Sequence, residues 1–538
     1  MSAIVASDLA YAHPGGDLLF ESVSFKLAPG RHAGLVGANG VGKSTLLRIL
    51  AGELEPLTGS ASAGARALWM AQDVGDAEGT VRELLLAPAP ARMRAAGLAV
   101  LDAERALATG DAEAGVRLGA AIGDWSDLGG YELEGAWDAA CRRIAGAGLD
   151  VVGERPSRTL SGGERKQLVL ELLFASDAPV LLLDEPDNFL DVPAKRRLEE
   201  RIRQTRKTVL LISHDRELLA AACDAIVTLE GNGSWVHGAS YATYPEARAH
   251  RQRLMGDRVA RWKAEERRLR ELMRTFKERA RYSSDWAKRA DAAETRWRRH
   301  VDEGPPQAPV VDRPIRVRLR GGDSARRVLA LHDVAIDGLV RPLTEEVHFG
   351  ERVALIGPNG TGKTHLLHLL AGEDVAHAGR LVVGPRVSPG LFTQLNRRAE
   401  LVAGTPLDAV AARLGGVGPA MSALARYGLQ DAARRSSATL SGGQRARLEI
   451  LCLEVDGHNL LLLDEPTDNL DIDSAGALEA ALEGFEGTIV AVSHDRAFLR
   501  TFDRFLLLGE DGSMVRLADA GEALRALEGP QATRSGPL

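Results

Sequence analysis

Residues 37–44 read Gly37-Ala38-Asn39-Gly40-Val41-Gly42-Lys43-Ser44, which fits the pattern G-x-x-x-x-G-K-[ST]. In loops of this kind the backbone N–H groups surround nucleotide phosphates, the lysine reaches the β- and γ-phosphates, and the hydroxyl group ligates Mg²⁺. An apolar run at 33–36 precedes the loop and a helix-forming segment at 45–50 follows it, as the pattern requires. A second match reads Gly357-Pro358-Asn359-Gly360-Thr361-Gly362-Lys363-Thr364. One match can arise by chance, but two in one chain predict two phosphate-binding loops.

The composition is that of an ordinary globular chain, and 538 residues are enough for two or more domains. Because the net charge is −7, the chain as a whole gives no electrostatic argument for nucleic-acid binding. Cys141, Cys223 and Cys452 are scattered without C-x-x-C spacing, which favours reduced thiols in a cytoplasmic protein. Residues 1–5 lack the features of a signal peptide, and no apolar stretch approaches about 18–20 residues, so we expect neither a secretion signal nor a membrane span.

A pair of acids ends an uninterrupted apolar run in the first half of the chain. The run at 180–183 is followed by Asp184 and Glu185. Such a run is typical of a buried parallel strand, and α/β proteins bind ligands at the carboxyl ends of these strands. We therefore expect Asp184 to hold Mg²⁺ through water and Glu185 to orient or deprotonate the attacking water. A solvated turn is the alternative, which the upstream phosphate loop disfavours.

Three further side chains lie where a nucleotide site could use them. Tyr11 belongs to a strand-like opening segment, and its ring can either stack on a nucleobase or pack within the sheet. Gln72 follows the short apolar run 67–70, where its amide can contact Mg²⁺ or the attacking water, although a lone glutamine is more often a surface residue. His214 follows the apolar run 209–212 and can sense the γ-phosphate, although a lone histidine is more often structural. Position alone supports these three roles.

The segment Leu160-Ser161-Gly162-Gly163-Glu164-Arg165 precedes a predicted helix over 166–174. Ser161 is a good N-cap candidate, and Glu164 complements the helix dipole in the first turn. The two glycines expose backbone N–H groups that can bind an anion. An ordinary capped helix start is the simpler interpretation, but so particular a segment favours the anion site.

The second half of the chain repeats these features in the same order. They are Gln394, Ser441-Gly442-Gly443-Gln444, an apolar run at 460–463 with Asp464 and Glu465, and Ser493-His494-Asp495. In both halves the serine of the Ser-Gly-Gly segment precedes the glutamate by 24 residues, and the glutamate precedes the histidine by 29. This register indicates an internal duplication.

The chain resembles a tandem ABC-type ATPase, because each half has a phosphate loop, a glutamine, an LSGG signature, an Asp-Glu strand end and a histidine. The resemblance covers about 4–235 and 328–515. It implies an α/β fold with two ABC-type P-loop ATPase domains, each with a helical subdomain, joined by a basic α-helical hairpin linker. It also implies that each ATP, with Mg²⁺ as cofactor, lies between the phosphate loop of one domain and the signature of the other.

The resemblance assigns roles to residues of both halves. It assigns hydrolysis to Glu185, Glu465, His214 and His494, and Mg²⁺ binding to Ser44, Gln72, Asp184, Thr364, Gln394 and Asp464. The first ATP site comprises Tyr11, Gly37, Asn39, Gly40, Gly42, Lys43, Ser44, Thr45 and Gln72, facing Ser441, Gly442 and Gly443. The second comprises Gly357, Asn359, Gly360, Gly362, Lys363, Thr364 and Gln394, facing Ser161, Gly162 and Gly163. Because both glutamates are present, we expect two hydrolysis-competent sites.

The sequence departs from the family pattern at two places. The segment aligned with residues 8–11 reads Asp333-Val334-Ala335-Ile336, so the second site lacks the stacking aromatic ring and is expected to hold adenine more loosely. After Asp-Glu-Pro, the two halves read Asp187-Asn188-Phe189-Leu190-Asp191 and Thr467-Asp468-Asn469-Leu470-Asp471. The ABC-F subfamily usually has Thr-Asn-His-Leu-Asp there, so contacts across the interface are expected to differ in the first half.

The connector between the halves is strongly basic. Residues 246–302 contain 18 Lys and Arg against 10 Asp and Glu, a net charge of +8 in an acidic chain. We predict two helices, at about 244–280 and 285–300, with a break at Tyr282-Ser283-Ser284. Its basic and aromatic side chains suit neutralising phosphates and stacking on unpaired bases, and the candidates are Arg274, Lys277, Arg279, Arg281, Tyr282, Trp286, Lys288 and Arg289. Acids at helical spacing equally suit a charged spacer.

The spacing of the motifs defines the expected domains. They are a first ATPase domain at 1–240, a helical linker with a flexible exit at 241–325, and a second ATPase domain at 326–538. The phosphate loop precedes the signature by 124 residues in the first half and by 84 in the second. The 40 extra residues predict an insertion at about 85–130.

The connector, the insertion and the segments 129–134 and 238–241 resemble those of the ABC-F family. That resemblance implies a cytoplasmic monomer that binds the 70S ribosome, with rRNA and P-site tRNA as contacts of the linker. ATP would close the two domains and favour binding, and hydrolysis would release the protein. The implied function is protection against peptidyl-transferase-centre antibiotics or relief of stalled translation.

Two other classes of ABC ATPase compete with this interpretation. The ATPase subunit of a transporter with separate membrane partners is the alternative, although it has no need of a basic hairpin between its domains. A DNA-directed ABC ATPase typically carries zinc-binding cysteine pairs or very long coiled coils, and neither occurs in the sequence.

Overall fold

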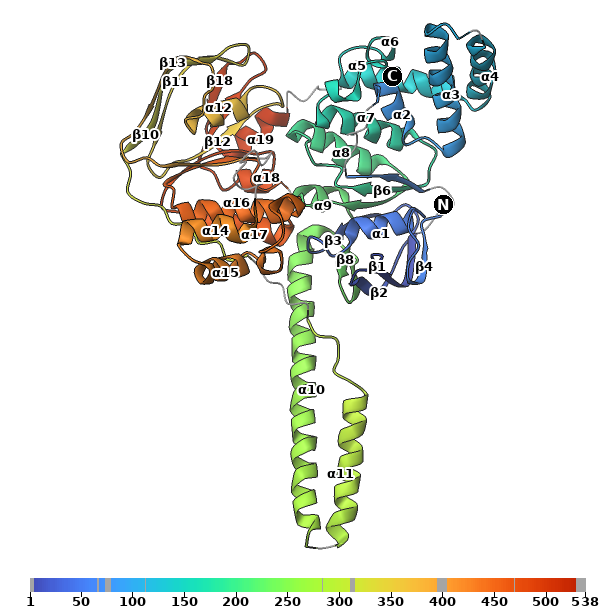
Figure 1. Ribbon diagram of the computed structural model, residues 1–538, viewed down its shortest axis with the longest axis vertical. Coiled ribbons are helices and arrows are strands. Elements are labelled where there is room, and N and C mark those ends of the chain that lie inside the picture. The colour runs from blue at the N-terminus through green and yellow to red at the C-terminus, as the bar shows by residue number, and fades with distance from the viewer. Residues whose placement is uncertain are drawn as a thin grey trace. The chain divides into compact units, whose positions relative to one another are not determined.

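The apolar runs that precede the polar motifs form the central strands of two six-stranded sheets (Figure 1). The computed structural model describes residues 4–64, 67–72, 79–111, 113–282, 284–309, 315–393, 404–468 and 470–528. The chain divides into two compact units, Met1–Gly238 with Pro314–Leu538, and Ala239–Arg313. The first unit contains both halves of the internal duplication.

The first half contains a mostly parallel sheet in the order β5-β6-β7-β3-β8-β9, in which only the β8–β9 pair is antiparallel. These strands are β3 (His32–Val36), β5 (Ala67–Met70), β6 (Val180–Asp184), β7 (Thr208–Ile212), β8 (Ala225–Glu230) and β9 (Gly233–His237). Every residue of β6, β7 and β8 is buried, which is why apolar residues predominate in these strands. A smaller antiparallel sheet, β2-β1-β4, consists of β1 (Ile4–Ala12), β2 (Leu18–Leu27) and β4 (Thr58–Ser62).

Helices complete the first half of the chain. They are α1 (Lys43–Leu50), α2 (Val81–Leu86), α3 (Ala91–Ala108), α4 (Ala114–Asp127), α5 (Gly130–Ile144), α6 (Leu149–Val152), α7 (Gly162–Ala175), α8 (Val192–Gln204) and α9 (Arg216–Ala222). Those from α2 to α7 share the core of a separate helical subdomain, around Trp125 and Trp137. Helices α3 and α4 pack against each other and lie inside the range 85–130 that the motif spacing indicates for an insertion.

The second half repeats both sheets. The mostly parallel sheet has the order β14-β15-β16-β12-β17-β18, and the antiparallel one has the order β11-β10-β13. Its strands are β10 (Arg327–Ile336), β11 (Val340–His348), β12 (Arg352–Ile356), β13 (Ala378–Val383), β14 (Pro389–Phe392), β15 (Leu460–Asp464), β16 (Thr488–Val492), β17 (Arg504–Leu508) and β18 (Met514–Leu517). Its helices are α12 (Lys363–Leu370), α14 (Pro406–Leu414), α15 (Val417–Arg426), α16 (Gly442–Asp456), α17 (Ile472–Glu483), α18 (Arg496–Leu499) and α19 (Ala520–Glu528). The shared strand order supports the duplication that the motif register indicates.

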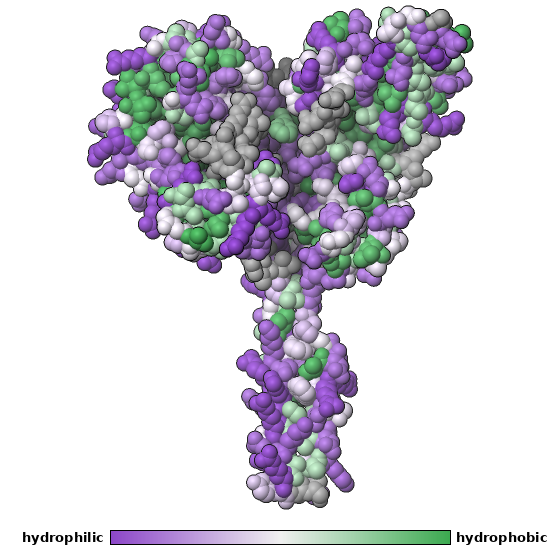
Figure 2. Space-filling model, viewed as in Figure 1, coloured by the Kyte–Doolittle hydropathy of each residue, from purple (hydrophilic) through white to green (hydrophobic). Residues whose placement is uncertain are grey.

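The second compact unit is a helical hairpin of α10 (Tyr244–Ala280) and α11 (Ser284–Asp302). The two helices predicted from the sequence are confirmed, and α11 extends two residues beyond its predicted end. They pack side by side through Ala290 and Ala293, through the stacked rings of Trp262 and His300, and through a hydrogen bond from Trp297 to Glu266. Hydrophilic residues cover most of the visible face of this hairpin (Figure 2).

Among the described residues, no helix combines the length and the apolar character that a bilayer span requires.

Gly130 illustrates how closely the helical subdomain packs, since a Cβ there would lie about 2.0 Å from the Trp125 ring. We predict that Gly130→Ala destabilises this subdomain by about 1–3 kcal/mol, because the added methyl group must displace a buried indole. Gly135 lies in the same helix, and a Cβ added there would have nothing within 4 Å, so Gly135→Ala is the matched control and is expected to be neutral or stabilising by up to about 1 kcal/mol. Urea unfolding followed by circular dichroism measures both variants, and equal midpoints would contradict the prediction.

Candidate functional site

Both phosphate loops end at a buried lysine that begins a helix. Lys43 is 7% exposed, and its Nζ donates to the carbonyl oxygens of Gly37 at 2.8 Å and Ala38 at 3.2 Å. Lys363 makes the same two bonds, to Gly357 at 2.8 Å and Pro358 at 2.6 Å. Burial lowers the pKa of both lysines, and the nearby carboxylates only partly oppose it. Each ammonium group is thus held inside its loop, where a bound phosphate would relieve the cost of burial.

The glycine before each lysine cannot be replaced by a larger residue. Gly42 has φ +100° and is the N-cap of α1, and a Cβ there would lie 2.8 Å from both Leu19 and Phe20 of β2. Gly362 has the same φ in the second half. Since positive φ and close contact both favour glycine, the loop can bring its N–H groups towards an anion.

The carboxyl ends of β6 and β15 carry the predicted metal ligands. Thr364 Oγ1 donates to Asp464 Oδ2 at 2.9 Å, and Ser44 forms the corresponding bond to Asp184. Burial raises the pKa of Asp184 to about 6, and within the described chain its Oδ1 has no hydrogen-bond partner. A buried carboxylate with an unpartnered oxygen beside a hydroxyl group is a donor set that suits Mg²⁺, which prefers oxygen ligands and takes few from protein.

Three side chains converge on Glu185, the residue after β6. Gln72 Nε2 donates to Glu185 Oε2 at 2.7 Å, Asn188 Nδ2 donates to the same oxygen, and His214 Nε2 lies 3.6 Å from Oε1. Burial alone would raise the pKa of Glu185, but the hydrogen bond and charge of His214, with Lys166 and Lys43, lower it. Glu185 therefore stays a carboxylate, as a group that orients or deprotonates water requires.

Glu465 has the same backbone position but a different surrounding. Both glutamates have left-handed φ, +47° for Glu185 and +49° for Glu465. The backbone N–H of His494 donates to Glu465 Oε2 at 3.0 Å, and His494 Nε2 lies 3.7 Å from Oε1. Asp468 occupies the place of Asn188, and burial together with Asp468 and Asp464 raises the pKa of Glu465 well above its usual range. The two glutamates thus differ in their electrostatic environment.

The signature of the first half lies at the phosphate loop of the second. Ser161 caps α7 as predicted, accepting from Glu164 N at 3.2 Å while Glu164 accepts from Ser161 N at 2.7 Å. A cavity of about 350 Å³ is lined by Ser161, Gly162, Gly163, Asn359, Gly360, Gly362, Lys363, Thr364, Asp464, Glu465 and His494, among others. These are the residues that the sequence groups into the second composite ATP site.

Further contacts cross between the halves at both phosphate loops. Asn359 Nδ2 donates to the carbonyl oxygen of Phe189 at 3.2 Å, and Phe189 has left-handed φ of +66°. In the reciprocal place, Asn39 N donates to Asp471 Oδ2 at 3.3 Å. The same oxygen, Asp471 Oδ2, forms an ion pair with Arg447 Nη2 at 2.6 Å. The asparagine of each loop therefore contacts the segment after Asp-Glu-Pro of the other half.

One predicted residue packs within the fold, and another lies outside the described residues. Tyr11 is only 8% exposed, and its ring packs against Phe20 of β2 and against His13. Its stacking on a nucleobase stays a prediction. Ile336, in the aligned segment, is also buried. Gln394, the expected counterpart of Gln72, lies outside the described residues.

The predicted nucleic-acid side chains lie at the closed end of the hairpin. The guanidinium groups of Arg279 and Arg289 lie 5.0 and 4.8 Å from the centre of the Trp286 ring. Tyr282 is 90% exposed, and Lys277 pairs with Glu294 at 2.7 Å. The exposed basic residues of this end are Arg274, Lys277, Arg279, Arg281, Lys288 and Arg289.

Sequence reasoning missed two lysines beside the site. Lys166 is buried in α7, and its Nζ donates to the carbonyl oxygen of Glu185 at 2.7 Å. Lys195 of α8 lines the cavity of the second site. A constant offset of 280 residues aligns the two halves from Ser161 onward. In this alignment the positions equivalent to the two lysines are alanines, Ala446 and Ala475. Comparing the halves position by position could have found them.

Comparisons with known proteins agree with this architecture. The sequence model of the family described as ABC transporter matches residues 20–188 and 340–468. An antibiotic resistance protein of Mycobacteroides abscessus is 44% identical over 96% of this chain and 98% of its own length. The tylosin resistance ATP-binding protein TlrC of Streptomyces fradiae is 32% identical, covering 90% and 93%. The ATP-binding cassette sub-family F member 3 of Mus musculus is 30% identical, covering 97% and 74%.

A solved structure, described as a model of ribosome-bound archaeal Pelota and ABCE1, shares the fold. It matches 95% of this chain and 78% of its own with a TM-score of 0.55 and 19% identity. The chain belongs to the ABC family of ATPases and, within it, to the ABC-F group. It is accordingly an ATP-binding protein and an ATPase, as the paired motifs predict.

Asn188 and Asp468 occupy equivalent positions beside the two glutamates, so placing the second half's residue type in the first half tests what this position does. We predict that Asn188→Asp slows hydrolysis at the first site about tenfold, because it replaces a hydrogen bond to Glu185 with carboxylate repulsion. The rate is measured with Glu465→Gln also present, so that the first site dominates turnover. Asn188→Ala, which removes the bond without adding charge, is expected to slow hydrolysis less. Equal rates with and without the Asn188→Asp change would mean that Asn188 does not orient Glu185.

Proposed function

We propose that this protein binds and hydrolyses two Mg²⁺–ATP molecules between its halves, and that it uses them to bind and leave the ribosome. Lys43 and Lys363 would contact the phosphates, and Ser44 with Asp184, or Thr364 with Asp464, would hold Mg²⁺. Bound Mg²⁺ would offset phosphate charge, and Glu185 and Glu465 would orient the attacking water. Gln72 would lie beside the Mg²⁺ of the first site, and Gln394 beside that of the second.

The composite cavity supports a closing function for ATP. A nucleotide in it would contact the phosphate loop of one half and the exposed N–H groups of Gly162 and Gly163 in the other. ATP then favours the closed arrangement by its differential affinity, and hydrolysis removes part of that affinity. Only a partner that binds the two arrangements differently can extract work from this cycle.

The basic hairpin is the observation that carries the choice of partner. We infer that its closed end contacts rRNA and P-site tRNA in the 70S ribosome, because Arg279, Trp286 and Arg289 combine phosphate-neutralising and base-stacking groups. A transporter ATPase gains nothing from such a surface. We divide the chain at 1–240, 241–325 and 326–538, with the α3–α4 pair as the insertion that touches the ribosome.

The names of two relatives support a role in resistance. One is an antibiotic resistance protein and the other a tylosin resistance protein, and both match nearly the whole chain. We therefore propose a cytoplasmic monomer that protects ribosomes from antibiotics of the peptidyl-transferase centre or relieves stalled translation. A hairpin whose closed end occupied the region of the peptidyl-transferase centre and the P-site tRNA would displace such a drug or the tRNA.

The double variant Glu185→Gln, Glu465→Gln tests this function first. We expect ATP binding to remain and hydrolysis to fall by about 10²-fold or more, because both water-orienting carboxylates are lost. Trapped in the closed arrangement, the variant should co-sediment with 70S ribosomes in ATP and inhibit translation. The wild-type chain with ADP is the control. A variant that stays in the supernatant with ribosomes, but pellets with membranes, would favour the transporter alternative.

The closed end of the hairpin should matter more than its general charge. In the trapped variant, we predict that Arg279→Ala and Arg289→Ala weaken ribosome binding and make its dependence on log salt concentration shallower, by about one unit for each phosphate that is no longer neutralised. The matched control is Arg258→Ala, which removes an exposed arginine of α10 that lies 21 residues before Arg279 and far from the closed end of the hairpin. If all three changes weaken binding equally, the hairpin acts through its overall charge.

A further inference from the structure

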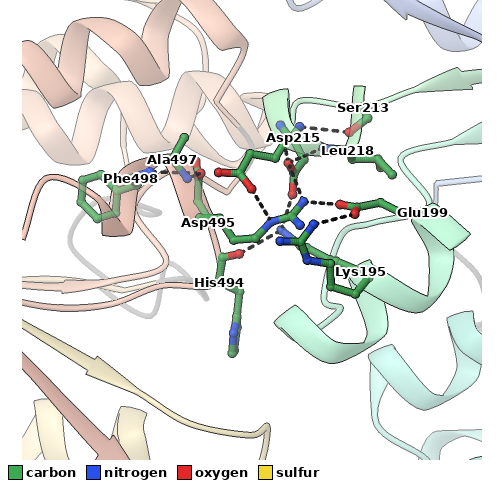
Figure 3. Close-up of polar contacts among 12 residues, drawn as sticks. Lys195, Glu199, Ser213, Asp215, Leu218, His494, Asp495, Ala497 and Phe498 are labelled. Carbon is green, nitrogen blue, oxygen red and sulfur yellow. Dashed lines mark hydrogen bonds and ion pairs between the residues drawn. The ribbon is translucent and has the colours of Figure 1, made fainter. Parts of the chain in front are cut away.

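Ion pairs cross between the halves at two equivalent places. Figure 3 shows one of them, where Lys195, Glu199 and Asp215 of the first half lie beside the segment that begins at His494 of the second. Arg216 of the first half pairs with Glu479 of the second, and Arg496 of the second half pairs with Glu199 of the first. At the offset of 280 residues these are equivalent pairs. The arginine of each Ser-His-Asp-Arg segment thus binds the glutamate of the helix that follows the other half's Asp-Glu-Pro.

Only one side of this arrangement contains a buried lysine. Arg496 is fully buried and also lies 3.5 Å from Asp215 and 3.3 Å from Glu217. Lys195, one turn before Glu199 on α8, joins the same cluster with its Nζ 3.2 Å from Asp215 Oδ2. On the opposite side, Ala475 stands at the position equivalent to Lys195. Glu217 is likewise equivalent to an alanine, Ala497, so the symmetry is broken at both residues. Of the two, Lys195 lines the cavity of the second site.

Lys195 reaches across the interface to the main chain of the second site. Its Nζ donates to the carbonyl oxygen of His494 at 3.3 Å. The backbone N–H of His494 donates to Glu465 Oε2 at 3.0 Å, and the ring nitrogen Nε2 of His494 lies 3.0 Å from Asn359 Oδ1. A lysine of the first half is thereby connected, through one residue, to the proposed catalytic carboxylate of the second.

The charges around Lys195 determine which of its bonds persists. The residue is 7% exposed, and although burial opposes its charge, Asp215 and Asp187 raise its pKa, so the ammonium stays protonated. Its bond to Asp215 lies within the first half and is charged at both ends, whereas the carbonyl of His494 is neutral and belongs to the second half. Separation of the halves would break the contact with His494 and would leave the ion pair with Asp215 intact within the first half.

We propose that Lys195 is a positioning residue that the first half supplies to the ATP site of the second, where it holds His494 and, through it, Glu465 in place only when the halves are together. The first ATP site has Ala475 at the equivalent position and so does without this contact. Closure is consequently required for the geometry of the second site in a way that does not apply to the first. The inference rests on the proposed roles of Glu465 and His494 in hydrolysis.

The test measures each site separately in the full-length chain. Glu185→Gln leaves hydrolysis to the second site, and Glu465→Gln leaves it to the first. Adding Lys195→Met, which keeps the length of the side chain but removes its charge, should lower kcat about tenfold in the Glu185→Gln chain with little change in KM. The decrease in the Glu465→Gln chain should be at least about fivefold smaller. Lys195→Arg, which retains a donor, should restore part of the rate.

Arg203→Met, on the exposed side of α8, is the matched control and should leave both rates unchanged. Equal decreases at the two sites would mean that Lys195 only holds the halves together, and this would overturn the proposal, as would an undiminished rate in the Glu185→Gln chain. Hydrolysis that survives in the double glutamine variant would instead contradict the assignment of the glutamates, and the inference would fall with it. The Glu465→Gln chain also reports folding, since an unfolded Lys195→Met chain would lose both activities.

Discussion

A lysine ammonium enclosed in a loop of backbone carbonyls needs an anion, and the two loops of this chain each contain one. Lys43 and Lys363 lie buried against oxygens of their own loops, and the carboxylates beside them only partly compensate for lost water. Phosphates bound in the cavity between the halves would supply the missing charge. In the proposed function, nucleotide binding, metal binding and contact with the opposing signature would therefore depend on the same electrostatic need.

The two sites have the same framework but differ in the charges around it. Glu185 is surrounded by donors from Gln72 and Asn188, whereas Glu465 faces the carboxylate of Asp468. Lys166 holds the backbone of Glu185, and Lys195 holds that of His494. These differences lie outside the two phosphate loops, so both loops keep the same lysine contacts while the charges around the two glutamates differ.

Features fixed by local pattern were predictable from the sequence. The strands at 180–184 and 460–464, the cap at Ser161 and the helices of the hairpin follow from apolar runs, capping chemistry and helical spacing. The cluster around Arg496 was not predictable from periodicity, because its partners are nearly 300 residues away and a buried charge has no local signature. Tyr11 shows the intermediate case, since its position in the sequence allowed both stacking and packing, and the contact of its ring with Phe20 is visible only in the fold.

The buried pairing of α8 with the second half has a consequence for how such a protein can evolve. In a dimer of identical chains, a lysine at one interface position would appear on both sides at once, and any change would alter both sites together. Joining the two copies in one polypeptide removes that constraint, so Lys195 can exist opposite Ala475. Gene fusion thus allows the two sites to acquire different side chains at equivalent positions.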